Sequence, residues 1–326
     1  MIRWSASACI RLAWIAIALL TAGAHADQPP GIPRLGVLVR PLANAPYEVG
    51  LREGLRELGY MEGKNIIIDW RRSVGGDEDR SVATDLARSN FDVIVVFSTP
   101  GARAAMEASP VMPIVFLSGD PVATGLAASL AKPGGNATGV TGVLTEISGK
   151  RLELFHQLAP RARRVVCLMN STNPSGVLQF EAAQTAAHTL GVQLVKVDVH
   201  NAAELDAALR ALPRGAKNGL FVTADGIFLV NKAKIAWAVR EARLPASFPY
   251  RDYHDEGALM SYGLNTREVG RKMAGYVDKI LKGAKPGEIP IEQVSKYELI
   301  IDLRVARELG LKVPQELLFL ADEVIR

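Results

Sequence analysis

The chain has 326 residues, of which 48% are apolar and 22% charged, and a formal net charge of +4. A chain of this size holds itself together by burying a core, and it usually divides into two domains. No run of five or more Lys or Arg residues occurs, so the charge gives little support for a nucleic-acid partner.

The first 26 residues have the pattern of a secretory signal peptide. Arg3 and Arg11 bracket a charged start, residues 12–20 form a short apolar run, and residues 24–26 (Ala-His-Ala) are a small-x-small cleavage motif. The apolar run is too short to span a bilayer. We therefore expect cleavage after Ala26 and a soluble mature protein in the periplasm.

Cleavage would change both the charge and the cysteine content. Loss of Arg3 and Arg11 leaves 36 basic against 34 acidic residues, a formal charge of +2. Loss of Cys9 leaves Cys167 as the only cysteine. We therefore expect no intrachain disulfide, even in an oxidising compartment.

Short apolar segments alternate with amphipathic ones along the rest of the chain. Strands are expected at residues 34–39, 65–70, 91–97, 113–117, 164–169, 192–197, 219–224 and 258–261. Helices are expected at residues 47–58, 79–88, 101–108, 149–159, 175–190, 201–211 and 227–242. This alternation predicts an α/β fold with parallel sheets and helices on both faces. Because the pattern runs twice, we expect two Rossmann-like lobes.

The glycine-rich stretch 129–151 (SLAKPGGNATGVTGVLTEISGKR) separates the two runs. A phosphate-binding P-loop has four residues between its first Gly and the Gly-Lys pair, followed by Ser or Thr. Here six residues separate Gly142 from Gly149, and Arg151 stands where the hydroxyl residue belongs. We interpret the stretch as a turn and a strand that lead across to the second lobe, with glycines available as hinge points.

Three longer segments carry a family resemblance: DPVATGLAASLAKPGGNATGVTG (120–142), GLNTREVGRKMAGYVDKILKGAKPGEIPIE (263–292) and LGLKVPQELLFLADEVI (309–325). The chain resembles the substrate-binding proteins of ABC transporters, and more narrowly the family that includes streptococcal tryptophan-binding proteins. The resemblance implies a type I periplasmic-binding fold, in which two α/β lobes joined by crossover strands close over a ligand.

Two further expectations come with the resemblance. The N-terminal lobe should comprise residues 32–142 with about 257–285, and the C-terminal lobe residues 143–256 with about 286–326. The chain also departs from the family pattern, because Asp302 stands where an Asn is usual before Leu. We expect that difference to affect packing more than ligand choice.

Ligands of parallel α/β sheets bind beyond the carboxyl ends of the strands, where helix N-termini present free N–H groups. Ser98 and Thr99 lie between a strand and a helix, so they are candidates to hold a ligand carboxylate, although either could simply cap the helix. Asp120 follows the next strand and suits a ligand ammonium group, although Asp before Pro also forms ordinary turns.

The second lobe offers a matching set of polar residues. Asn170, Asn173 and Ser175 belong to the segment NSTNPS after an apolar strand, and they either bind the ligand or begin the next helix. Asp225 follows another strand and is a second candidate for an ammonium group, with helix capping as the alternative.

Aromatic residues lie near several of these loops. Tyr47 begins a helix after the first loop, which starts at Pro41, and Tyr250 and Tyr262 lie in later loops. A Tyr ring can stack on a planar ligand, although a half-buried surface Tyr is equally ordinary. If several converge, the ligand should carry an aromatic or flat apolar part.

Other functional classes find little support in the sequence. No G-x-S-x-G, H-E-x-x-H or C-x-x-C motif occurs, and no two His residues have metal-ligand spacing. We therefore expect neither catalysis nor a metal or other cofactor. Sugar-responsive repressors share the expected fold, but they place a helix-turn-helix where this chain has a signal peptide.

We therefore expect an exported, monomeric receptor of an ABC importer. It would bind a small amphipathic ligand, such as an aromatic amino acid, between its lobes and present it to the permease subunits in the membrane. Two alternatives stay open: a ligand-binding sensor subunit for a membrane receptor, and a receptor for aromatic acids that lack the ammonium group.

Overall fold

The computed structural model describes residues 31–42 and 45–326. The predicted signal peptide lies outside the described residues. The compact unit that forms the fold comprises Pro33–Arg326.

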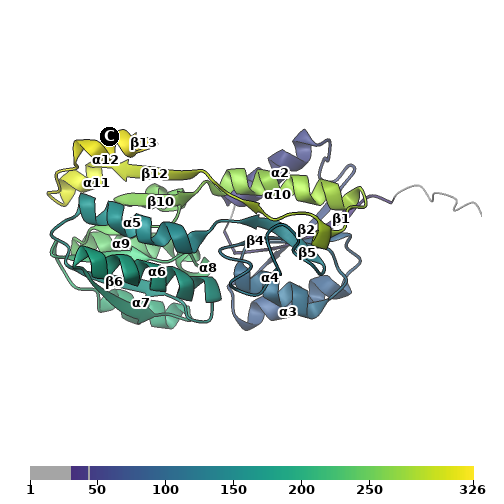
Figure 1. Cartoon of the computed structure of the whole chain (residues 1–326), viewed down its shortest axis with the longest axis horizontal. Coiled ribbons are helices and arrows are strands. Elements are labelled where there is room, and N and C mark those ends of the chain that lie inside the picture. Colours follow the sequence, from purple (N-terminus) through teal and green to yellow (C-terminus); the bar gives the residue numbers. More distant parts are fainter. Residues whose placement is uncertain (1–30, 43–44) are drawn as a thin grey trace, which may run out of the picture. The chain divides into compact units, whose positions relative to one another are not determined.

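The first sheet has six parallel strands in the order β11-β5-β4-β3-β1-β2. Strands β1, β2, β4 and β5 of this sheet lie together in Figure 1. The strands are β1 (Arg34–Val39), β2 (Ile67–Arg72), β3 (Val93–Val96), β4 (Ile114–Ser118), β5 (Ala137–Thr141) and β11 (Glu292–Gln293). The flanking helices are α2 (Pro46–Glu57), α3 (Asp77–Arg88), α4 (Thr99–Ala108) and α10 (Thr266–Leu281). The short 3₁₀-helix η2 (Pro286–Glu288) precedes β11.

The apolar strands of this sheet are buried on both faces. Val37 and Val95 pack with α2 and α10, whereas their chain neighbours Leu38 and Val96 pack with α3 and α4. Successive side chains of a strand point to opposite faces, so strands covered by helices on both sides must be apolar throughout. This explains why the run 93–96 shows no polar alternation.

The second sheet has seven strands in the order β13-β12-β10-β9-β8-β6-β7, and the pair β10–β12 is antiparallel. The strands are β6 (Arg164–Met169), β7 (Gln193–Asp198), β8 (Asn218–Val222), β9 (Ala246–Phe248), β10 (Met260–Leu264), β12 (Tyr297–Asp302) and β13 (Glu323–Ile325). The helices are α5 (Leu144–Leu158), α6 (Pro174–Leu190), α7 (Ala202–Arg210), α8 (Gly226–Val230), α9 (Lys232–Ala242), α11 (Leu303–Glu308), α12 (Gln315–Leu320) and the 3₁₀-helix η1 (Arg251–Glu256). The predicted α/β class, with two mostly parallel sheets, is confirmed.

Two stretches differ from the predicted lobe boundaries. Strand β10, predicted for the N-terminal lobe, pairs with β9 and β12 of the second sheet. Strand β11, predicted for the C-terminal lobe, pairs with β5 of the first sheet. The chain therefore changes sheet later than expected, after β10 and again after β11. The predicted helix 227–242 is also divided at Asn231 into α8 and α9.

Asp302, where the chain departs from the family pattern, ends β12 and is fully buried. Its Oδ1 atom accepts the backbone N–H of Arg304 at 2.8 Å and so caps α11. Its Oδ2 atom accepts a 2.6 Å hydrogen bond from the Nη2 atom of the same Arg304. The arginine two residues on therefore supplies the counter-charge that a buried carboxylate requires.

Candidate ligand-binding site

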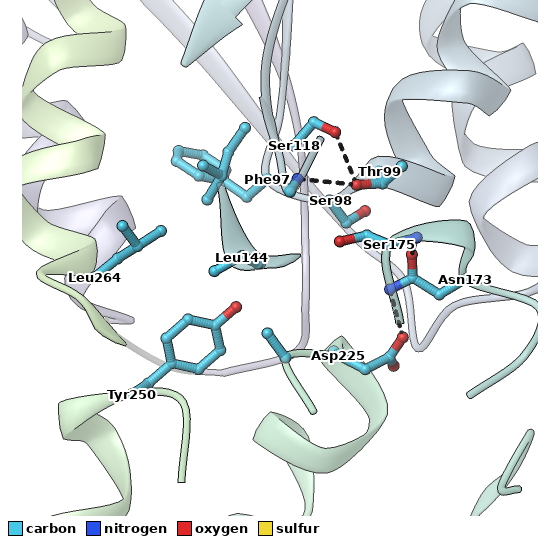
Figure 2. Close-up of a pocket in the computed structure, with 14 residues that line it drawn as sticks. Phe97, Ser98, Thr99, Ser118, Leu144, Asn173, Ser175, Asp225, Tyr250 and Leu264 are labelled. Carbon is cyan, nitrogen blue, oxygen red and sulfur yellow. Dashed lines mark hydrogen bonds between the residues drawn. The ribbon is translucent and has the colours of Figure 1, made fainter. Parts of the chain in front are cut away.

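A cavity lies where loops of the two sheets meet, at the ends of β3, β4 and β8 (Figure 2). Its volume is about 50 Å³. We call it the inner cavity. It is lined by Phe97, Ser98, Thr99, Leu117, Ser118, Gly119, Leu144, Asn173, Ser175, Ala224, Asp225, Gly226, Tyr250 and Leu264.

The inner cavity has a polar side and an apolar side. Figure 2 shows Ser98, Thr99, Ser175 and Asn173 together on one side, with the Leu264 side chain opposite them. Among the described residues that line the cavity, Asp225 is the only one with a charged side chain. The arrangement suits a small molecule with a charged polar end and an apolar end.

The start of α4 forms one part of the polar side. The Ser98 Oγ atom accepts a hydrogen bond from the backbone N–H of Gly101 at 3.1 Å. Ser98 therefore caps the helix, which was the alternative to ligand binding in the sequence analysis. Because that oxygen is used as an acceptor, the hydroxyl proton is free to point at a ligand oxygen. Thr99 is buried, and its hydroxyl lies 3.0 Å from that of Ser118.

The starts of α6 and α8 form the other part. The Asn173 Oδ1 atom accepts the backbone N–H of Ser175 at 3.1 Å and so caps α6. Asp225 caps α8 in the same way, its Oδ1 atom accepting the N–H of Ile227 at 2.9 Å. The Ser175 hydroxyl accepts from Gln179 Nε2 at 3.3 Å, so its proton is also free to donate. The N-termini of α4 and α6, both with positive helix-dipole ends, therefore contribute to one cavity.

Aromatic rings close the apolar side. Phe97 lines the cavity, and Tyr47 stacks behind it at 4.5 Å between ring centroids. The hydroxyl of Tyr250 points toward the middle of the residues drawn in Figure 2. Burial raises the pKa of Tyr250 above its ordinary value, so the hydroxyl stays protonated and can donate a hydrogen bond.

Six of the predicted site residues line the inner cavity: Ser98, Thr99, Asn173, Ser175, Asp225 and Tyr250. Tyr47 is one layer removed, behind Phe97. Asn170 does not line the cavity either, but it contacts a residue that does: its Nδ2 atom donates to Asp225 Oδ2 at 3.4 Å.

Besides Tyr47 and Asn170, three more predicted residues lie outside the cavity lining. The Asp120 carboxylate accepts hydrogen bonds from the backbone N–H and the hydroxyl of Thr145, which lies near the start of α5, so its acceptor capacity is partly used within the protein. Tyr262 lies in β10 with its ring centroid 6.0 Å from that of Tyr297. Pro41 is exposed just after β1.

Most of the apolar lining, and Ser118, was not predicted from the sequence. Phe97 follows the last residue of β3, and Ser118 is the last residue of β4, so a search of strand ends as well as of the following loops would have found both. Leu144 begins α5 and Leu264 ends β10, and both flank segments that connect the sheets. Their convergence depends on how the chain crosses between the sheets, which no local pattern shows.

Known proteins are similar to this chain both in sequence and in fold. The sequence pattern of the family described as ABC transporter substrate binding protein matches residues 41–325. The chain belongs to that family. The resemblance drawn from the three sequence segments is therefore confirmed, and the protein is a substrate-binding protein of the ABC type.

Individual relatives agree with this assignment. A "Tyrosine-binding protein" of Clostridioides difficile (strain R20291) is 28% identical over 255 residues, which cover 78% of this chain and 73% of that protein. A conserved domain protein from Vibrio cholerae O1 biovar El Tor superimposes with a TM-score of 0.83 at 25% identity, covering 90% of this chain and all of that one. An ABC domain from Streptococcus pneumoniae, solved in complex with L-Trp, gives a TM-score of 0.80 at 23% identity over the same shares of the two chains.

The fold of this substrate-binding protein is the type I periplasmic-binding fold. Across residues 31–42 and 45–326, no helix is both long enough and apolar enough to cross a bilayer. In the same part of the chain, no three His, Cys, Asp or Glu side chains are grouped so that they could hold a metal ion.

Proposed function

We propose that this protein is the solute receptor of an ABC importer and that its ligand is a zwitterionic amino acid with an aromatic side chain. The observation that carries the proposal is the division of the inner cavity. Two helix N-termini with free hydroxyl protons and the carboxylate of Asp225 lie on one side, and apolar and aromatic residues lie on the other.

Each part of such a ligand has a chemical counterpart in the cavity. A carboxylate suits the hydroxyls of Ser98 and Ser175 at the starts of α4 and α6. An ammonium group suits Asp225, which has acceptor sites beyond those used by Asn173 and Ile227. An aromatic side chain suits the apolar surface of Phe97, Leu144 and Leu264. Because the cavity has a volume of only about 50 Å³, the two lobes would have to move apart to admit the ring.

The relatives support the same ligand class. The C. difficile relative is named for tyrosine, and the S. pneumoniae structure contains L-Trp. Both ligands combine a zwitterionic end with an aromatic ring, as the two sides of the cavity require.

The cellular part of the proposal rests on the sequence pattern and the family. Residues 1–26 carry the features of an export signal, and substrate-binding proteins of ABC transporters act outside the cytoplasmic membrane. The mature protein would act in the periplasm as a monomer. Ligand binding would favour the arrangement in which both lobes contact the ligand, and the permease would recognise that arrangement.

A thermal-shift screen of the refolded protein lacking residues 1–26 tests the ligand class. The probes are L-Tyr, L-Trp and L-Phe, their deaminated acids, aliphatic amino acids and sugars. A ligand at a hundred times its Kd stabilises the folded state by about 2.7 kcal/mol, so aromatic amino acids should raise the Tm by several degrees. A response to the deaminated acids alone would replace the ligand class with aromatic acids. A response to sugars alone would refute the proposal.

A further inference from the structure

Arg40 follows β1 and is held rigidly although it is not part of the inner cavity lining. Its Nη1 and Nη2 atoms donate to the two carboxylate oxygens of Asp79 at 2.7 and 2.9 Å. Nη1 also donates to the Ser73 carbonyl at 3.1 Å. The side chain of Arg40 is only 12% exposed and that of Asp79 only 2%. A buried two-point ion pair of this kind fixes the position of the guanidinium plane.

The stem of Arg40 lies against Gly226 of the second lobe. A Cβ atom added at Gly226 would lie 2.2 Å from Arg40 Nε and 2.9 Å from its Cδ. Gly226 is the first residue of α8, and its φ is not in the left-handed region, so the backbone conformation does not demand glycine. The close approach of Arg40 is therefore the physical reason for a residue without a side chain at this position.

Arg40 also stands between two cavities. A larger cavity of about 740 Å³, which we call the outer groove, is lined by both lobes, and its lining includes Arg40, Asp79, Asn170 and Asp225. Asp225 lines the inner cavity as well, and Ser98 of the inner cavity lies 3.4 Å from Arg40 Nη2. The guanidinium therefore lies at the boundary between the two cavities.

We propose that Arg40 limits the length of the ligand, because its side chain, fixed on Asp79 and seated on Gly226, closes the inner cavity against the outer groove. The site would then accept a single amino acid and reject a peptide, whose second residue would have to occupy the space of Arg40. This inference rests on the proposed function, since it assumes that the ligand binds in the inner cavity.

The contact between Arg40 and Gly226 can be tested with the substitution Gly226→Ala. Alanine is a better helix former than glycine, so an effect on α8 alone would leave the free protein as stable as before or slightly more stable. Because Arg40 belongs to the first lobe and Gly226 to the second, the new methyl group should instead hold the two lobes apart at this contact and lower the affinity for L-Tyr by at least about tenfold. Gly275→Ala in α10 is the matched control, because no atom lies within 4 Å of a Cβ added there.

A double-mutant cycle tests whether Arg40 causes the loss. Arg40→Ala alone would leave the buried Asp79 carboxylate without its partner, so the cycle uses Arg40→Ala with Asp79→Asn as its background. Titration calorimetry with L-Tyr should show that Gly226→Ala costs little in this background. An equal loss in both backgrounds, or no loss in either, would overturn the role of Arg40.

The dipeptides Tyr-Gly and Gly-Tyr test the length limit directly. The wild-type protein should bind neither, and the Arg40→Ala/Asp79→Asn variant should bind at least one of them while it still binds L-Tyr. If this variant binds L-Tyr and neither dipeptide, the length limit is wrong. If the wild-type protein binds no aromatic amino acid at all, the proposed function fails first, and that result is visible before any variant is made.

Discussion

The side-chain amide of Asn173 donates a 2.8 Å hydrogen bond to the Oδ2 atom of Asp225. Each of these residues caps its own helix, Asn173 the start of α6 and Asp225 the start of α8. The bond therefore joins two helix N-termini and fixes the direction of the one charged group among the described residues of the inner cavity. A carboxylate held in this way is prepared to receive a cation without reorganising.

Asp225→Asn should weaken binding of L-Tyr by about 1.5–3 kcal/mol, because a hydrogen bond to a charged group is lost. Asparagine is as good an N-cap as aspartate, so α8 should keep its start. Titration calorimetry with L-Tyr and with 3-(4-hydroxyphenyl)propanoate, which lacks the ammonium group, measures the effect. The substitution should affect the amino acid far more than the acid. An equal loss for both ligands would assign Asp225 a purely structural role.

Gly50→Ala and Gly270→Ala should each destabilise the protein, because α2 and α10 touch through these glycines. A Cβ at Gly50 would lie 1.9 Å from the carbonyl oxygen of Arg267, and one at Gly270 would lie 2.1 Å from that of Tyr47. The helices would have to move apart, at a cost of about 1–3 kcal/mol despite the better helix propensity of alanine. Urea unfolding measures the change. Gly275→Ala, also in α10 but with free space around it, should not be destabilising.

His254 should make the protein less stable as the pH falls from about 6.5 to 4. Burial lowers the pKa of His254 from 6.5 to about 4 in the folded state, where its Nε2 atom lies 3.0 Å from the Ser261 hydroxyl. Between these values the unfolded chain binds the proton and the folded chain does not, so the free energy of unfolding rises with pH. The free energy of unfolding is therefore highest above pH 6.5, and it falls by about 3 kcal/mol on acidification to pH 4 because of His254.

Unfolding free energies at pH 4 to 7 for the wild type and His254→Gln measure this contribution. The variant should show a shallower dependence on pH, whatever its stability at pH 7. Identical slopes for the wild type and His254→Gln would mean that folding does not lower the pKa of His254.

Cys167 should resist thiol reagents until the protein unfolds. The residue is fully buried in β6, and burial raises the pKa of its thiol to about 12, so almost no thiolate exists at pH 8. In the chain lacking residues 1–26, a colorimetric disulfide reagent should titrate no thiol in buffer and one thiol in urea. Cys167→Ser should give no signal in either condition. Rapid labelling of the native protein at pH 8 would contradict the buried placement.

The sequence by itself determined the order and kind of the elements from β1 to α9, apart from the break at Asn231, but helices α10, α11 and α12 were not predicted. Apolar runs such as 93–96 predict strands covered on both faces, and the caps Ser98, Asn173 and Asp225 lie in the segments that follow such strands. The same local rule located much of the polar side of the cavity, because polar residues between a strand and a helix lie at the carboxyl edge of a parallel sheet.

Only the tertiary structure decided which of these residues share a cavity. Asp120 satisfies the same local rule as Asp225, yet it hydrogen-bonds Thr145, which follows the chain's crossing to the second sheet. Arg40 and Gly226 are far apart in sequence and show no motif, but they touch because the ends of β1 and β8 face one site. Helix capping acts over a few residues, so the local sequence predicts it. Close packing between lobes depends on all the intervening turns, and it appears only once the chain is folded.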